Sequence, residues 1–245
     1  METKTTDYVY NNVIQIDDAD ASRKFIAKVF AWMFVALGIS AACSYLFAFI
    51  PELSALLRDN ETSKSNLLGM VVMFSPLIFI FIARAVFTKG SFFTLAIVFI
   101  GFSAVMGISL SYIFYFYPAS TIAGVFITTS VVFGAMAIGG YITHQDLTKF
   151  GGIMIMLLIG IVVATILNMF IFRSGSLDLI ISYVGVAVFT GLTAYDVQKL
   201  KRIGGGYEYG DATKSKIALM GALTLYLDFV NLFLMLLRIF GGNRR

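Results

Sequence analysis

Asp228 is the residue most suited to chemistry, because it is a carboxylate in the middle of an apolar run. Between Lys216 and Arg238 it is the one acidic side chain, and the run between them is long enough for a helix to cross a hydrocarbon core of ~30 Å. An ionised carboxylate at mid-depth costs ~2.5 to 3.5 kcal/mol, so it should face protein or water rather than lipid. Asp228 is therefore a candidate functional site.

A second carboxylate, Asp196, lies near the end of the preceding apolar run. On helical spacing, Asp228 shares a face with Thr224 and Asn231, and Asp196 shares one with Thr193. If the acids met on consecutive antiparallel helices, they could not both be ionised cheaply and would titrate in coupled steps. Such a pair would be a pH sensor.

The spacing along the chain leaves open whether these acids meet. Asp228 lies ~16 Å into its run, whereas Asp196 lies only ~5 Å before Lys199 at the end of the other run. Contact requires the sixth helix to continue past Lys199 to the glycines at 204–206. Otherwise Asp196 pairs with Lys199 or Lys201 at the interface, and Asp228 bonds to Asn231 or Thr224 on its own helix.

Three other polar side chains need an interpretation. Arg84 follows the second apolar run, where it could pair with an aspartate and hold that side of the protein shut, or serve only as a topology anchor. Asn168, in the fifth run, could join helices or line a path. His144 lies in a short loop, where we expect it to be solvated. Cys43 is the one cysteine, which excludes an intrachain disulfide.

Composition identifies the class of protein. Hydrophobic residues make up 59% of the 245 residues and charged residues 13%, with a mean hydropathy of +0.88. This is more apolar surface than a soluble domain can bury, so we predict an all-α, polytopic membrane protein. The net charge of +4 comes from Lys and Arg at the edges of the apolar runs, which is typical of membrane topology and not of nucleic-acid binding.

The apolar runs predict seven transmembrane helices in a single domain, over residues 29–50, 67–83, 91–116, 120–142, 152–172, 177–195 and 217–237. Residues 1–28 are expected to form a polar cytoplasmic segment, residues 29–240 the membrane domain, and residues 241–245 a short basic tail. Most Lys and Arg at helix ends fall on the side of the N-terminus, which predicts a cytoplasmic N-terminus. Arg238, Arg244 and Arg245 favour a re-entrant last segment as the alternative.

Two acids on the sixth and seventh helices are also typical of intramembrane aspartyl proteases. Those enzymes have glycines beside the second aspartate, whereas this chain has the bulky Leu225 and Leu227 there. The seventh run has no internal lysine for a Schiff base, which disfavours a retinal-type receptor. We therefore expect no enzyme activity and no cofactor.

The segments GLTAYDVQKLK at 191–201 and ALTLYLDFVNLFLMLLRIFG at 222–241 resemble the two signature segments of the Bax inhibitor-1 (transmembrane Bax inhibitor motif) family. The resemblance implies a last helix that is central, surrounded by the other six. It implies that Asp196 and Asp228 form a pH-sensing pair that governs a calcium leak, and that the arginine matching Arg84 latches the closed state. The short N-terminus is similar to that of bacterial members, which implies a bacterial plasma (inner) membrane.

The main functional expectation is therefore a pH-sensitive, passive calcium (cation) leak channel, with a role in protection from stress or cell death. Calcium would bind transiently to Asp196 and Asp228, since it prefers carboxylate oxygen. The partners expected are the lipid bilayer and calcium ions, and no nucleic acid. The alternative, also implied by the resemblance, is a regulator that transports nothing and modulates a membrane-bound AAA protease.

Overall fold

The computed structural model describes residues 4–58, 65–72, 75, 82, 85–87, 90–206 and 211–242, with side chains described from residue 20 and, after the last gap, from residue 213. The regular structure of these residues is helical. Its elements are α1 (Lys4–Phe49), α2 (Pro51–Leu57), α4 (Phe92–Leu110), α5 (Ile113–Phe116), α6 (Ala119–Ile142), α7 (Thr148–Leu167), η1 (Asn168–Phe172), α8 (Gly175–Gly205) and α9 (Asp211–Phe240).

Six of the helical segments within the described residues are long and apolar enough to cross a membrane. They are Asp20–Phe49, Phe92–Phe116, Ala119–Ile142, Thr148–Phe172, Gly175–Gly205 and Thr213–Phe240. The prediction of a polytopic, all-α membrane protein is confirmed. The predicted span at 67–83 is helical at 67–72, and most of its remainder lies outside the described residues, as does Arg84.

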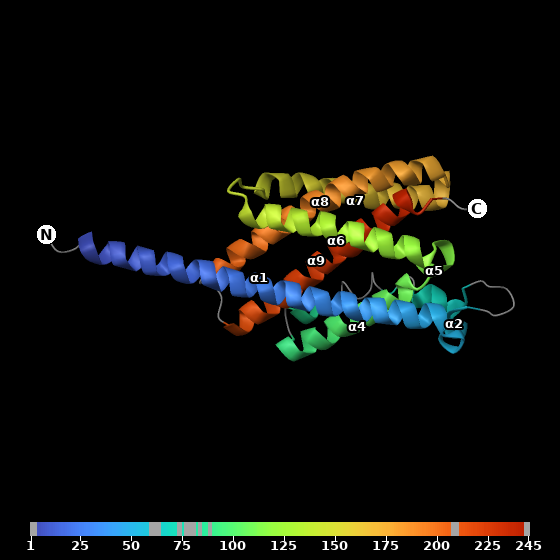
Figure 1. Ribbon diagram of the computed structural model, residues 1–245, viewed down its shortest axis with the longest axis horizontal. Coiled ribbons are helices and arrows are strands. Elements are labelled where there is room, and N and C mark those ends of the chain that lie inside the picture. Colours follow the sequence, from blue (N-terminus) through green and yellow to red (C-terminus); the bar gives the residue numbers. More distant parts are fainter. Residues whose placement is uncertain are drawn as a thin grey trace.

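The last helix, α9, lies at the centre of the bundle. It packs against α8, α1, α6 and α4, and in Figure 1 it runs between α1 and α6. Of its most apolar window, 67% is buried, compared with 11% for the span that contains α7. The prediction of a central last helix is therefore confirmed.

Two helices differ from their predicted bounds. α1 begins at Lys4 and continues without interruption into the first span, so residues 4–28 of the predicted polar segment belong to the same helix. α8 continues to Gly205, beyond the predicted end at residue 195. Its last turns carry Lys199, Lys201 and Arg202, whose long side chains can reach the interface while the backbone stays helical.

Glycines allow two pairs of helices to approach closely. A Cβ at Gly107 of α4 would lie 2.7 Å from the Cα of Ser40 in α1, and a Cβ at Gly140 of α6 would lie 2.7 Å from the Cα of Ala194 in α8. Without a hydrophobic driving force between helices in lipid, such close backbone packing is a main source of helix association. The Gly140 contact fixes α8 two residues before Asp196.

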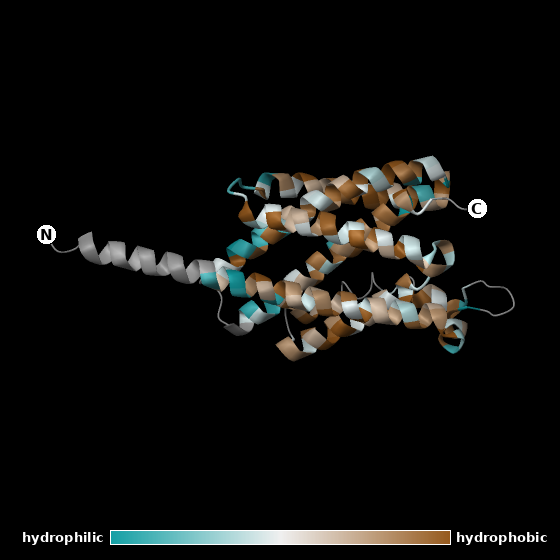
Figure 2. Ribbon diagram, in the orientation of Figure 1, coloured by the Kyte–Doolittle hydropathy of each residue, from teal (hydrophilic) through white to brown (hydrophobic). Residues whose placement is uncertain are grey.

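The outer surface of the bundle is apolar, and the polar residues gather at its ends (Figure 2). On α7, Met156 is 66% exposed and Ile159 is 60% exposed. Surface of this kind is stable against hydrocarbon and not against water. We call the end of the bundle that holds Arg23 and Lys201 the Lys201 end, and the opposite end, where Arg238 pairs with Asp178, the Arg238 end.

Candidate functional site

The extension of α8 is held in place by polar contacts at the Lys201 end. The ammonium of Lys201 donates to the backbone carbonyl of Tyr141 in α6 at 2.7 Å, and the hydroxyl of Ser22 in α1 donates to the carbonyl of Lys201 at 2.9 Å. Gly204 lies against Phe25 of α1, where a Cβ would come within 2.9 Å of the Phe25 Cβ. These contacts keep residues 199–205 helical, which the contact between the two acids requires.

The register of α8 against α9 brings the acids to nearly the same level. Gly221 of α9 lies against Leu200 of α8, so Asp196, four residues before Leu200, is level with Leu225, four residues after Gly221. Asp228 is three residues further along α9, an axial offset of ~4.5 Å. A side chain spans this offset, whereas it could not span the gap expected from the shorter predicted helix.

The carboxyls of Asp196 and Asp228 lie within hydrogen-bonding reach of each other. Asp228 is 6% exposed, and Asp196 is half-buried. Among the described residues, the Oδ2 atom of Asp228 has no hydrogen-bond partner. Two ionised carboxylates have no donor between them, so a single shared proton is what would satisfy the buried oxygen.

The charged environment of the pair is simple within the described part of the chain. Lys199, on the same helix as Asp196, acts on Asp196 through its charge, and each aspartate acts on the other. Lys201, the other interfacial partner considered for Asp196, instead donates to Tyr141 and lies 4.8 Å from the centroid of its ring. Arg84 falls outside the described residues, so its predicted role stays a prediction.

Among the residues that the structure describes, no hydrogen bond joins the predicted supporting residues to the pair. The hydroxyl of Thr193 donates to the carbonyl of Phe189 at 2.7 Å, and that of Thr224, which is exposed, donates to the carbonyl of Met220 at 3.1 Å. Each hydroxyl thus donates its hydrogen bond to a backbone carbonyl of its own helix. The alternative in which Thr224 donates to Asp228 is wrong. Asn231 is half-buried on the same face as Asp228.

Asn168 closes the turn at the end of the fifth predicted helix. It lies in η1, at the turn between α7 and α8, where its amide donates to the carbonyl of Ser174 at 3.1 Å and accepts from the Ser174 N–H at 2.9 Å. These bonds link the end of the span Thr148–Phe172 to the start of α8, and a role of Asn168 in lining a path stays a prediction. Its amide is 8% exposed and closes the turn in which Arg173 has a φ of 48°.

A second buried polar cluster, which the sequence analysis missed, lies elsewhere on α9. The hydroxyl of Ser40 in α1 donates to the carbonyl of Ser103 in α4 at 2.7 Å, and it lies 2.7 Å from the hydroxyl of Tyr226. Because the Ser40 proton is used by Ser103, Tyr226 must be the donor to Ser40. Tyr226 is wholly buried, and its spacing of two residues from Asp228 turns it to the opposite side of α9.

An ion pair outside the membrane fixes the loop between α6 and α7. Arg202 lies 2.7 Å from a carboxylate oxygen of Asp146, and Gln198 bonds the backbone of that loop at Gln145 and Leu147. Hydrogen bonds from Thr148 and Arg202 hold the pKa of the Asp146 carboxyl well below its usual value. His144, predicted to be solvated, is exposed in the same loop.

The donor set at Asp196 and Asp228 differs from a resident metal site. Within the described ranges, no three or more His, Cys, Asp and Glu side chains come together in a group that could hold a metal ion. Calcium takes six to eight oxygen ligands in a stable site, which is more than two carboxylates supply. Leu225, at one of the protease glycine positions, is wholly buried by its neighbours.

The similarity to known proteins extends over the membrane-spanning helices described above. Residues 22–245 match the protein family described as Inhibitor of apoptosis-promoting Bax1. The inner membrane protein YbhL of Escherichia coli (strain K12) is 41% identical over 221 residues, which cover 90% of this chain and 92% of that protein. An uncharacterized protein of Borreliella burgdorferi is 39% identical over 221 residues, covering 90% and 93%. An uncharacterized membrane protein of Streptococcus pyogenes serotype M1 is 35% identical over 237 residues, covering 95% and 99%.

Proposed function

Because this chain belongs to the Bax inhibitor-1 family, we propose that it is a passive, pH-sensitive leak channel for calcium, gated by Asp196 and Asp228. The observation that carries the proposal is the contact between these two carboxyls inside a membrane bundle, with one oxygen of Asp228 lacking a partner among the described residues. A packing role alone leaves that unpaired oxygen unexplained. A proton that enters and leaves the pair accounts for it.

The gate works through the charge of the pair. With one proton between them, the carboxyls hydrogen-bond and hold α8 against α9. With both ionised, two like charges face each other in a medium of low dielectric constant and repel. The proton therefore biases the packing of α8 on the central helix. Lys199 offsets part of the charge on Asp196, and we propose that Arg84 pairs with the acids in the closed state.

Calcium is the proposed cargo because of the chemistry of the pair. Ionised carboxylates supply the oxygen ligands that calcium prefers, and two of them give weak, reversible binding. A pathway needs binding that is strong enough for entry and weak enough for exit. Asp196 is half-buried and Asp228 is 6% exposed, so a cation that reached the first acid would meet the second one further inside.

The proposal is tested by calcium flux from proteoliposomes that contain the purified full chain, measured over a range of pH. Wild type should show flux that depends on pH, and the double variant Asp196→Asn plus Asp228→Asn should lose that dependence, because an amide cannot titrate. Asp178→Asn is the matched control on α8, since it removes an acid from the Arg238 end. Flux in the double variant with the pH dependence of wild type would refute the gating role.

The same experiment separates the channel from the alternative function. If neither wild type nor any variant conducts calcium, the channel proposal fails. A membrane-bound AAA protease that copurifies with the chain would then support a regulatory role, in which the two acids specify packing. We propose a bacterial inner membrane with a cytoplasmic N-terminus for either function, in line with the name of the Escherichia coli relative.

A further inference from the structure

A groove that no part of the gating proposal uses runs between α1 and α6. It consists of two adjacent hollows of about 380 and 350 Å³, which share Phe30 of α1 as a wall. Val197 of α8 lines the first hollow, and Phe229 of α9 lines the second. Both volumes are in the range of ligand pockets in proteins. We call the two hollows together the α1–α6 groove.

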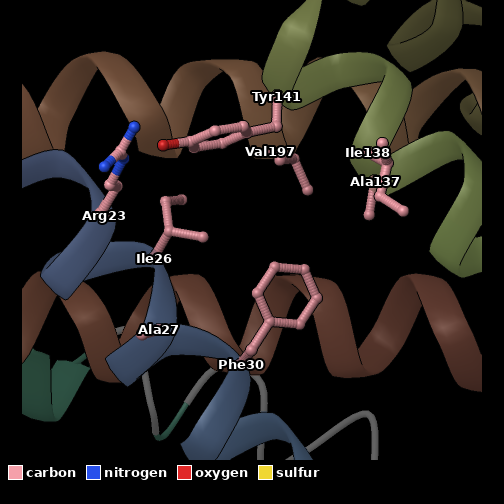
Figure 3. A pocket seen from close by; sticks show the side chains of 8 residues that line it. All are labelled: Arg23, Ile26, Ala27, Phe30, Ala137, Ile138, Tyr141 and Val197. Atoms are coloured by element: carbon pink, nitrogen blue, oxygen red, sulfur yellow. The ribbon is translucent and has the colours of Figure 1, made fainter. Parts of the chain in front are cut away.

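The groove is apolar and opens sideways toward the bilayer. Its walls include Ile26, Phe30, Leu37, Phe133, Ala137 and Ile138. In Figure 3, Ile26, Phe30, Val197 and Ile138 surround the first hollow. Two of the wall residues are largely uncovered, since Phe34 is 65% exposed and Ile138 is 63% exposed. Because this surface lies at the depth of the hydrocarbon, the occupant must be an apolar chain that enters from the membrane.

The mouth of the groove at the Lys201 end is cationic. Figure 3 shows the guanidinium of Arg23 and the hydroxyl of Tyr141 pointing toward each other across this mouth. The ammonium of Lys201 lies 4.8 Å from the ring of the same tyrosine. Arg23 has an ion pair of 3.9 Å with Asp20, but both side chains are exposed, so the guanidinium is open to a stronger anion.

The length of the groove suits a lipid. From Arg23 to Gly38, which lines the second hollow, α1 rises ~22 Å, whereas one leaflet contributes ~15 Å of hydrocarbon. On α6, Gly134 lies ~10 Å below Tyr141, within the same leaflet. An acyl chain whose phosphate sat at Arg23 would therefore pass Gly134 before the midplane.

We propose that the α1–α6 groove binds an anionic glycerophospholipid, with one acyl chain between α1 and α6 and its phosphate held by Arg23 and Tyr141. Lys201 adds a second positive charge beside the headgroup. Basic side chains near the membrane surface attract anionic lipid by ~1 kcal/mol each, which is about fivefold in affinity per residue. A zwitterionic lipid with the same chains fills the apolar part equally well and lacks this gain.

Native mass spectrometry of the full chain, incubated with equal amounts of phosphatidylglycerol and phosphatidylcholine of the same acyl composition, tests the headgroup assignment. Wild type should retain phosphatidylglycerol in about fivefold excess or more. Arg23→Gln should reduce that preference about fivefold, whereas the control Lys149→Gln, at the same end of the bundle on α7, should leave it unchanged. Equal retention of both lipids by wild type, or an unchanged preference in Arg23→Gln, would overturn the proposal.

A second pair of variants on α6 tests the groove itself. A side chain at Gly134 would extend into the second hollow, and a Cβ there meets nothing within 4 Å, so Gly134→Leu blocks the groove without a backbone clash. Gly124 is equally open and lines neither hollow, which makes Gly124→Leu the control. Retained lipid should fall in Gly134→Leu alone, and equal retention by the two variants would contradict the assignment. The readout is lipid mass, so it is independent of calcium flux.

Discussion

Gly140→Ala is expected to displace the helix that carries Asp196. The new methyl group would lie 2.7 Å from the Cα of Ala194 and 2.8 Å from its carbonyl carbon, and closer still to its oxygen. Ordinary contact begins at 3.4 Å, so α6 and α8 must separate by at least 0.7 Å at this point. Both sides of the contact are backbone, so no side-chain rotation relieves it.

The size of the effect follows from two opposing contributions. Overpacking of this kind costs ~1 to 3 kcal/mol, and replacing glycine by alanine in a helix gains ~1 kcal/mol. Gly139, the preceding residue of α6, is exposed, and a Cβ there meets nothing within 4 Å. Gly139→Ala should therefore be stabilising, and the two variants should differ in their free energy of unfolding by ~1 to 3 kcal/mol, since the helix gain cancels.

Reversible unfolding in mixed micelles, followed by circular dichroism at one pH, measures this difference. The two alanine variants have the same composition, so micelle effects cancel in the comparison. Equal stability of Gly140→Ala and Gly139→Ala would refute the close approach of α6 to α8 at Ala194, two residues before Asp196.

Three further expectations concern polar side chains away from the pair. Ser40→Ala should lower the free energy of unfolding by ~1 to 3 kcal/mol, because it leaves the buried hydroxyl of Tyr226 without an acceptor. Tyr226→Phe removes that hydroxyl and should cost less, ~0.5 to 1.5 kcal/mol. The same unfolding assay in micelles measures which variant is less stable. Asn168→Ala should cost ~1 to 3 kcal/mol and speed hydrogen exchange at the turn before α8, and unchanged exchange there would contradict the turn-closing role. Folding lowers the pKa of the Asp146 carboxyl from 3.8. The stability that this carboxylate adds is therefore present above pH 3.8 and is lost as the pH falls through the pKa of Asp146 in the folded protein. Slow exchange at the amide of residue 148 should thus persist below pH 3.8 in wild type and be lost in Asp146→Ala, which has no side-chain acceptor for that amide.

The fold class and the central position of the last helix could be predicted from the sequence. The fold class depends on local apolar runs, and the position of the last helix was implied by the resemblance of two sequence segments to a known family. Apolar runs of spanning length identify helices wherever the solvent is hydrocarbon. The end of α8 could not be located in this way. Lys199 and Lys201 mark an interface by charge, yet the helix continues beyond them because Ser22 and Tyr141, far away in the sequence, bond to Lys201.

The sequence singled out Asp196 and Asp228 by their residue type, but it could not predict the hydrogen bonds around them. Spacing suggested Thr224 as a donor to Asp228, but a hydroxyl on a helix can bond to the carbonyl four residues earlier, and it does so here. The bonds of Asn168 to Ser174 could not be predicted, because a turn and an apolar run have no sharp border in the sequence. The donor role of Tyr226 depends on contacts among three helices, which no local pattern encodes.

The most direct test of the central claim is a double-mutant cycle on the pH dependence of calcium flux. Asp196→Asn, Asp228→Asn and the double variant are compared with wild type in proteoliposomes at the same series of pH values. If the two carboxyls share one proton, as we propose, either single substitution should abolish most of the pH response, and the second should add little to the first. Two single variants that each lose an independent part of the response, with losses that add in the double variant, would contradict a shared proton and the gate built on it.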